Sequence, residues 1–468
     1  MRRTIFALLG VTLIASLIPV HAASAPDRRL PSDIASVGRT ELVAPFRIAA
    51  QKAPRSKSKG GWFLNVDTGF EAAEPTLAVL EDGSIVTQSW TETLRSTDRG
   101  DSWEVVHTAP TSGLTLDPYI HADAETGRIL ASQLLGACQM LSISDDSGST
   151  WIDAPTQCPS GDHQKIGSGP WHDPSNKLYP RAFYTCLNKV IDTACSMSYD
   201  GGLTWGPQVI VFPGVDTSAE RYLTTYPLCG GLEGDPVSGP DGTIYVPREY
   251  CGRPFLGVSK DDGLTWTRHW VSEPAQTSPV GYGANNPSVY VDPDGTVFYA
   301  WTGDDWSHYV AYSTDQGETW SKQMKVSPAG VETTTFPMII AGKGGRVATA
   351  FIGTSEGPAN PGDVGEEAVW HLYLSYSLNA DSKKARWQTI RVTDHPIRIG
   401  CVGRHGGDAS PPCSYGDLLD FNDIAFLNDG RLAMSYTDGC LEGCDKPNAP
   451  AQNRLVIAIQ TKGPSFSP

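Results

Sequence analysis

The octapeptide Ser-Thr-Asp-Gln-Gly-Glu-Thr-Trp at residues 313–320 is one of five copies of a motif that reads Ser-x-Asp-x-Gly-x-Ser/Thr-Trp. The other copies span residues 96–103, 144–151, 198–205 and 259–266. Consecutive motif aspartates are 48, 54, 61 and 54 residues apart, a period that suits one four-stranded blade of a β-propeller. The repeat therefore predicts an all-β propeller in which each copy marks one blade.

Each residue type in this box suits a tight turn between two strands. The Ser and Asp side chains can bond to nearby backbone groups, and the Gly adopts left-handed dihedral angles that are costly for other residues. The Trp begins the next strand and buries a large apolar area. We therefore expect the five boxes to be structural rather than catalytic.

The boxes are the ends of longer units. Turn-and-strand steps such as Asp-Gly-Ser-Ile-Val at 82–86 recur seven times, although the sixth unit has lost its box and the seventh stops after its third strand at 456–459. An N-terminal strand can complete the last blade and remove its open edges, and residues 41–48 (ELVAPFRI) are the candidate. The sequence thus predicts seven four-stranded antiparallel blades. Six blades with an irregular insertion are the alternative.

The N-terminal region indicates export. Two arginines precede an apolar run at residues 5–20 and small residues that permit cleavage, so residues 1–25 are a predicted signal peptide. Residues 26–60 are expected to be a linker apart from the strand at 41–48, and the propeller is expected at 61–465. Removal of residues 1–25 moves the formal charge from −16 to −18, which makes nucleic acid an unexpected partner. We expect a secreted, extracellular or periplasmic monomer with no membrane span in the mature chain.

All ten cysteines lie after the predicted signal peptide. An even number in an exported chain favours disulfides over metal sites. Pairing between nearest neighbours is the hypothesis, and it gives five bridges: Cys138 with Cys158, Cys186 with Cys195, Cys229 with Cys251, Cys401 with Cys413, and Cys440 with Cys444. No cofactor is expected beyond a structural calcium ion.

Alignment of the units exposes the residues that begin the innermost strands, which surround the central channel of a propeller. They are Glu74-Pro-Thr, Asp117-Pro-Tyr, Asp162-His-Gln, Asp235-Pro-Val, Asn286-Pro-Ser, Phe336-Pro-Met and Phe421-Asn-Asp. Proline at the second place suits the first residue of a strand, and His163 and Asn422 break that pattern. The result is an acidic ring with one imidazole. Carboxylates of this kind can act as acid and base, hold calcium, bind sugar hydroxyls, or simply accept turn hydrogen bonds.

The repeated octapeptide resembles the Asp-box of the sialidase superfamily. That resemblance implies a β-propeller whose site has three carboxylate-binding arginines, a tyrosine nucleophile assisted by a glutamate, and an aspartate acid/base. In the fourth unit, Gly231-Leu-Glu233-Gly-Asp-Pro and the following Arg248 are similar to the sialidase stretch that supplies the glutamate and the second arginine. The resemblance therefore assigns these roles to Glu233 and Arg248.

Elsewhere the sialidase pattern fails. Glu74 stands where the first arginine is expected, His308 lies where the third is expected, and Phe421-Asn422-Asp423 replaces the start that should carry the tyrosine. Bidentate contacts between arginine and carboxylate are among the strongest polar interactions of such a site. A typical exo-sialidase is therefore not expected.

The sequence favours a sialidase-like glycoside hydrolase acting on an extracellular glycan. Its expected catalytic residues are Glu233, Asp162, His163 and Arg248. Its expected substrate-binding residues are Glu74, Asp117, Tyr119, Asp235, Asn286, Asn422 and Asp423. Two alternatives stay open: a uronate-directed polysaccharide lyase that uses His163 and a tyrosine, and a non-catalytic propeller that binds glycan or protein. Fold alone does not decide between them.

Overall fold

The computed structural model describes most of the unit Pro45–Pro468. Outside the described residues lie 1–50, 59, 73, 111–115, 176, 190–191, 215–230, 251, 272–285, 403–417, 419–421, 442–443, 445–452 and 468. The predicted signal peptide, most of the predicted linker and residues 41–48 are therefore not part of the structural description. None of the described residues forms a helix, so none forms one with the length and apolar character of a membrane span.

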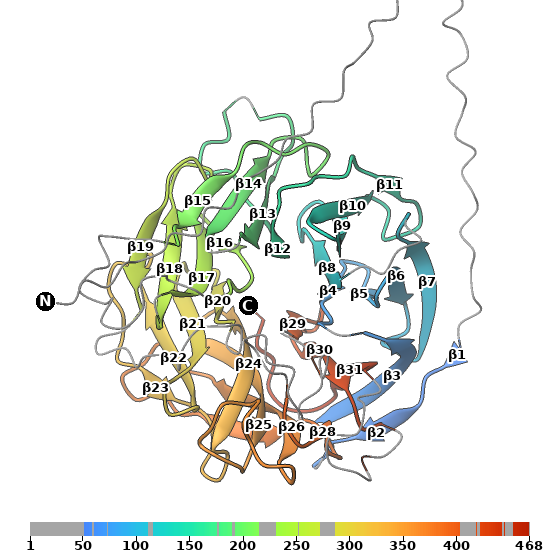
Figure 1. Ribbon diagram of the computed structural model, residues 1–468, viewed down its shortest axis with the longest axis vertical. Helices are drawn as coiled ribbons and strands as arrows, with labels where there is room; N and C mark the ends of the chain where they lie inside the picture. Colours follow the sequence, from blue (N-terminus) through green and yellow to red (C-terminus); the bar gives the residue numbers. More distant parts are fainter. Residues whose placement is uncertain are drawn as a thin grey trace, which may run out of the picture. The chain divides into compact units, whose positions relative to one another are not determined.

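Seven antiparallel sheets follow one another around a central axis (Figure 1). The first blade contains β4 (Leu77–Val79), β5 (Ile85–Gln88), β6 (Glu92–Ser96) and β7 (Ser102–Thr108), and the second contains β8 (Leu116–Ala122), β9 (Ile129–Leu135), β10 (Cys138–Ser144) and β11 (Ile152–Asp153). The third blade contains β12 (Asp162–Gly169), β13 (Ala182–Asn188), β14 (Thr193–Ser198) and β15 (Val209–Phe212). The fourth contains β16 (Val237–Ser238), β17 (Ile244–Tyr250), β18 (Arg253–Ser259) and β19 (Thr267–Trp270).

The remaining three blades complete the ring. They contain β20 (Ser288–Val291), β21 (Val297–Thr302), β22 (His308–Ser313) and β23 (Met324–Lys325); β24 (Thr333–Gly342), β25 (Arg346–Thr354), β26 (Val369–Ser377) and β27 (Gln388–Arg391), with β28 (Arg398–Ile399) beside β26; and β29 (Asp423–Phe426), β30 (Leu432–Asp438), β31 (Arg454–Gln460) and β3 (Phe63–Glu71). The seven-bladed all-β propeller predicted from the sequence is confirmed, and the six-bladed alternative is wrong.

The last blade is closed by β3, which pairs with β31 in antiparallel register. Phe63 and Val66 of β3 are fully buried, so this strand contributes to the core as well as to the ladder. Two short strands also lie in the expected linker: β2 (Arg55–Lys57) pairs with β3, and β1 (Gln51–Lys52) pairs with β7. The closing position assigned from sequence to residues 41–48 is thus occupied by a strand that begins further along the chain.

The five boxes share one hydrogen-bonded turn. In each, the Gly N–H donates to the Ser Oγ over 2.7 to 2.9 Å, and the Ser hydroxyl donates to Oδ1 of the Asp. The same carboxylate accepts the backbone N–H and the hydroxyl of the Ser or Thr before the Trp. The box aspartates are therefore occupied by their own turns, as the structural interpretation predicts.

The sixth blade retains more of the box than its sequence suggests. Ser377 occupies the place of the box serine, because it pairs with Val347 as the box serines pair in other blades. Its hydroxyl donates to Asn379 Oδ1 over 3.1 Å, so Asn379 stands where the box aspartate would be. Asn379 Oδ1 also accepts the backbone N–H of Arg386, the residue before Trp387, over 3.1 Å, so two bonds of the box turn persist without a carboxylate.

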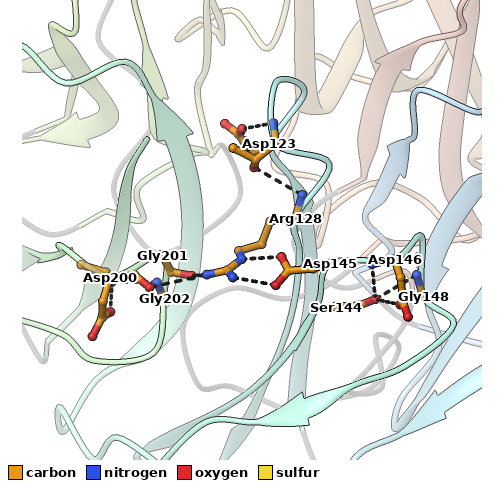
Figure 2. Close-up of polar contacts among 11 residues, drawn as sticks. Asp123, Arg128, Ser144, Asp145, Asp146, Gly148, Asp200, Gly201 and Gly202 are labelled. Carbon is orange, nitrogen blue, oxygen red and sulfur yellow. Dashed lines mark hydrogen bonds and ion pairs between the residues drawn. The ribbon is translucent and has the colours of Figure 1, made fainter. Parts of the chain in front are cut away.

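Every box turn also contacts the blade before it. Figure 2 shows the third box, where Arg128 of the second blade bonds to both oxygens of Asp145 and donates to the carbonyl of Gly201 over 2.9 Å. The corresponding contacts of the other boxes are Arg95 with Ser147, Lys177 with Asp262, Asp241 with Gln316, and Asp429 with Arg99. The boxes therefore join neighbouring blades as well as turning the chain.

The disulfide hypothesis is confirmed for three pairs. Cys138 is bonded to Cys158, Cys186 to Cys195, and Cys440 to Cys444. Cys401 is also disulfide-bonded, while Cys413, Cys229 and Cys251 lie outside the described residues. The described cysteines are thus all oxidised.

Replacement of Arg128 by Met should lower the free energy of unfolding by about 1–3 kcal/mol, because it removes charge-assisted bonds to Asp145 and Gly201 between two blades. Urea denaturation measures the effect. The matched control is Arg386→Met, at an exposed arginine, which should change stability by less than about 0.5 kcal/mol. Equal effects of the two substitutions would contradict the role of Arg128 in joining blades.

Candidate functional site

The strand ladders fix which residue begins each inner strand. In each box-bearing blade the box Ser pairs with a second-strand residue, which pairs in turn with a residue of the inner strand. We call the residue five places before that inner-strand residue the ring position. In the sixth blade, which lacks a box, Ser377 takes the place of the box Ser and gives Phe336 as the ring position. The ring position is occupied by Glu74, Asp117, His163, Glu233, Asn286 and Phe336.

This register corrects two alignments made from the sequence. The third blade places His163 rather than Asp162 at the ring position, and the fourth places Glu233 rather than Asp235 there. The sequence alignment followed the Asp-Pro pair at 235–236, which the ladder shows to lie two residues further into the blade. Asp235 instead shares its place with Tyr119 and Lys165, which also lie two residues beyond the ring position.

Several ring positions adopt a left-handed backbone conformation. The φ angles are 59° at Glu74, 47° at Asp117, 58° at His163 and 54° at Phe336. Such angles are uncommon outside glycine. Because the apolar Phe336 shares the conformation with three polar residues, we attribute it to the way the chain enters a blade and not to the chemistry of one side chain.

Glu233, His163 and Asn286 form a buried series across three adjacent blades. Asn286 donates from Nδ2 to His163 Nε2 over 3.1 Å, and His163 Nδ1 lies 3.9 Å from Glu233 Oε1, which is longer than a hydrogen bond. Glu233 is 0% exposed. Burial raises its pKa to about 8, although the charges of Arg248 and Lys165 act in the opposite direction.

Arg248 of β17 is fully buried, and its guanidinium donates hydrogen bonds to main-chain carbonyls. Its Nε and one terminal nitrogen donate to the carbonyl of Gly231 over 3.2 and 3.0 Å, and its other terminal nitrogen donates to the carbonyl of Phe212 over 3.4 Å. It faces Glu233 across an isolated bridge. The guanidinium thus fixes the entry to the fourth blade, and the structure does not present it as an anchor for a substrate carboxylate.

Lys165 is the central residue that the sequence interpretation missed. Its ammonium lies 3.7 Å from Asp235 Oδ1 and 5.0 Å from the centre of the Tyr119 ring. Burial lowers its pKa, whereas the charges of Asp235, Glu74, Asp117 and Glu233 act to raise it. The available signal was the missing proline in Asp162-His-Gln-Lys. This unit is shifted by one residue, so Lys165 takes the place that Tyr119 holds in the second blade.

Asp117 and Asp162 form a carboxyl pair beside His163. Asp117 Oδ2 accepts the His163 N–H over 3.0 Å, and the Gln164 side chain donates to the Asp117 carbonyl over 2.7 Å. Asp162 is exposed as a residue, yet the packing around its carboxyl group and its hydrogen-bonded neighbour Asp117 raise its pKa to about 6. The pair therefore places one carboxyl group with a raised pKa, that of Asp162, at the start of the third blade.

A second pair of carboxyl groups is formed by Asp235 and Asp423. Asp423 accepts the backbone N–H of Leu77 over 2.9 Å and its own neighbour's N–H, at Ile424, over 2.7 Å. Burial and the adjacent charge of Asp235 raise the pKa of Asp423 to about 8. They also raise the pKa of Tyr119, which is hydrogen-bonded to Asp235, well above its usual value.

Most of the predicted site residues therefore come together. Contacts or charge interactions link Glu74, Asp117, Tyr119, Asp162, His163, Glu233, Asp235, Asn286 and Asp423, with Lys165 among them. Asn422 is buried next to Asp423. Arg248 is close to Glu233 but is turned to main-chain carbonyls. The described residues contain no group of three or more His, Cys, Asp or Glu side chains arranged to hold a metal, and the predicted calcium ion stays untested.

A family model of the BNR/Asp-box repeat matches residues 311–322, which include the fifth box. The chain is an Asp-box β-propeller. The resemblance to the sialidase superfamily is thus confirmed for the repeat and the blades. The departures at the ring also stand: Glu74 holds the ring position of the first blade, and His308 is buried on β22, where it bonds to Thr349 over 2.6 Å.

No curated protein matches this Asp-box propeller. Among solved structures it is similar to a protein of unknown function from Dyadobacter fermentans, at 16% identity over 88% of this chain and 99% of that one, with a TM-score of 0.43. It is also similar to the NanB sialidase of Streptococcus pneumoniae (12% identity, 88% and 70%, TM-score 0.43) and to the Aleuria aurantia lectin (12%, 68% and 94%, TM-score 0.40). At these identities and TM-scores the likeness carries no argument about activity.

Replacement of Glu233 by Gln keeps the shape of the side chain and removes its ionisation. The folded pKa of about 8 lies above the reference value of 4.5, so the wild-type protein should lose stability as the pH rises between these values. The variant lacks this loss, and the difference in the free energy of unfolding should shift in its favour across the same range. Denaturant titrations at a series of pH values measure it. A difference that does not change with pH would contradict the buried, protonated Glu233.

Proposed function

We propose that this Asp-box propeller is a glycoside hydrolase that acts on an extracellular glycan. The observation that carries the proposal is the cluster of carboxyl groups at the inner-strand starts, in which Asp162 is exposed and Asp235 is partly exposed. Asp162 is exposed, and its pKa of about 6 suits an acid that protonates a glycosidic oxygen near neutral pH. We assign Asp162 as the general acid.

A second carboxylate must act from the other side of the scissile bond. Asp117 is hydrogen-bonded to Asp162, whereas the two carboxyl groups of glycosidases stand about 5–10 Å apart. Asp235 fits the second role better, because it is partly exposed and the ammonium of Lys165 compensates its charge from 3.7 Å. We therefore assign Asp235 as the base or nucleophile, and the buried Glu233 and His163 as positioning residues.

Two other functions are weighed against this proposal. The uronate lyase loses support because Arg248, an arginine of the expected site that could neutralise a uronate carboxylate, donates to the carbonyls of Gly231 and Phe212. Binding without turnover is the second candidate. It is favoured by the burial of Glu233 and His163, which are 0% and 2% exposed, so neither side chain is open to act on a scissile bond.

Export is part of the proposal as well. The described chain carries disulfides at Cys138–Cys158 and Cys186–Cys195, and such bridges form and persist in oxidising compartments. Together with the apolar run at residues 5–20, they support secretion to the extracellular space or the periplasm.

Replacement of Asp162 by Asn should lower kcat/KM at least about 100-fold, because the amide cannot donate a proton to the leaving group. Activity is followed as new reducing ends on a panel of neutral, amino, uronic and sialylated glycans. The wild-type rate should fall as the pH rises above about 6, where Asp162 loses its proton. The control is Asp294→Asn, an equal change of charge at an exposed turn beyond the far end of β20.

Three results would overturn the assignment. Full activity of the Asp162→Asn protein would exclude Asp162 as the acid. Ultraviolet absorbance of unsaturated products would identify a lyase instead. Tight glycan binding with no turnover on any member of the panel would establish the binding function in place of the hydrolase.

A further inference from the structure

Carboxyl groups outnumber cationic groups at the inner-strand starts. Six carboxyl groups lie at or next to the starts of the inner strands: Glu74, Asp117, Asp162, Glu233, Asp235 and Asp423. Lys165 is the ammonium group that interacts with most of them, and the guanidinium of Arg248 is directed to backbone carbonyls. The carboxylates of this site would repel a ligand that carries a carboxylate and would attract one that carries a positive charge.

The site also contains buried oxygen atoms that need donors. Glu233 Oε1 and Gln164 Oε1 have no hydrogen-bond partner, and both residues are at most 1% exposed. Glu233 Oε1 faces the imidazole of His163. The Gln164 side-chain amide is held in place because its Nε2 donates to the carbonyl of Asp117. Asn422 Oδ1, next to Asp423, is likewise without a hydrogen-bond partner. Buried polar atoms of this kind are costly unless a ligand or water satisfies them.

The chemical group that answers both observations is an ammonium. It has three N–H donors, no acceptor and a positive charge, whereas an N-acetylated amine offers one N–H donor and no charge. Carboxylates in low-dielectric surroundings bind such a group by charge-assisted hydrogen bonds, which are roughly twice as strong as neutral ones. Sugar hydroxyls supply donors too, but they do not neutralise the excess of carboxylates.

We infer that the inner-strand starts recognise amino sugars with a free ammonium group, in preference to N-acetylated, uronic or sialylated sugars. The inference rests on the proposed function for the location of the site and specifies its substrate class. A consequence concerns protons. Glu233 and Asp423, whose pKa values are both raised to about 8, carry protons at neutral pH, and an entering cation stabilises their ionised forms. Binding of the amino sugar at about pH 5.5, where its amine is already protonated, should therefore release protons.

The test uses two ligands that differ only in the amine: β-1,4-linked glucosamine oligomers and N-acetylglucosamine oligomers of equal length, with sialyllactose and oligogalacturonate as anionic probes. Isothermal titration calorimetry at about pH 5.5, where the amine is protonated, is repeated in buffers of different ionisation enthalpy and gives both the affinity and the protons released. The glucosamine oligomer should bind at least about tenfold more tightly than its acetylated partner, with net proton release. Asp162→Asn and Asp235→Asn should each weaken it about tenfold or more, and Asp294→Asn should not.

The inference is overturned if the acetylated or the anionic ligands bind as tightly as the amine, or if the Asp162→Asn protein, whose altered residue is exposed, keeps full affinity. Turnover is measured separately on the same ligands. Preferential binding of the amine without cleavage would sustain the inference and reject the hydrolase. Cleavage of glycans without preference for the amine would sustain the hydrolase and reject the inference.

Discussion

Closure of the last blade by β3 is the constraint on which the rest of this propeller depends. The ladder between β3 and β31 joins residues such as Phe63 and Gln460, which are separated by almost the whole described chain. It removes the open sheet edges that an uncapped seventh blade would expose. Because each box turn also contacts the preceding blade, the ring is held both at this seam and at its turns. The inner strands then begin at fixed places around one axis (Figure 1).

The site follows from that geometry. Equivalent strand starts in neighbouring blades bring together side chains that are far apart in the sequence, and the fold imposes the same entry conformation on Glu74, Asp117, His163 and Phe336. What differs between blades is the chemistry of the residue. Packing so many carboxyl groups into partly buried surroundings raises the pKa values of Asp162, Glu233 and Asp423 while Lys165 offsets part of the charge. Protonation of some of these carboxyl groups and the buried ammonium of Lys165 reduce the electrostatic repulsion between the carboxylates.

Much of the fold could be predicted from the sequence, because the boxes are local turns whose Ser, Asp and Gly have fixed mechanical roles. Their spacing gave the seven units, and proximity gave the three disulfides that the structure describes. The closing strand could not be chosen, since its pairing with β31 is non-local. The site register failed where proline stops marking the strand start. The ring position of the third blade is therefore His163, one residue after the predicted Asp162, and that of the fourth is Glu233, two residues before the predicted Asp235. For the same reason the sequence interpretation missed Lys165. The hydrogen bonds from Arg248 to backbone carbonyls depend on the tertiary structure, so no sequence motif predicts them.

The most direct test of the central claim is a crystal structure of the Asp162→Asn protein with a bound glucosamine oligomer. The acidic inner-strand starts should hold the sugar, with its ammonium within hydrogen-bond distance of Asp235 or Glu233 and its glycosidic oxygen next to residue 162. A sugar bound instead on the box turns or on the outer strands, with the ring unoccupied, would contradict the claim that this ring is the functional site.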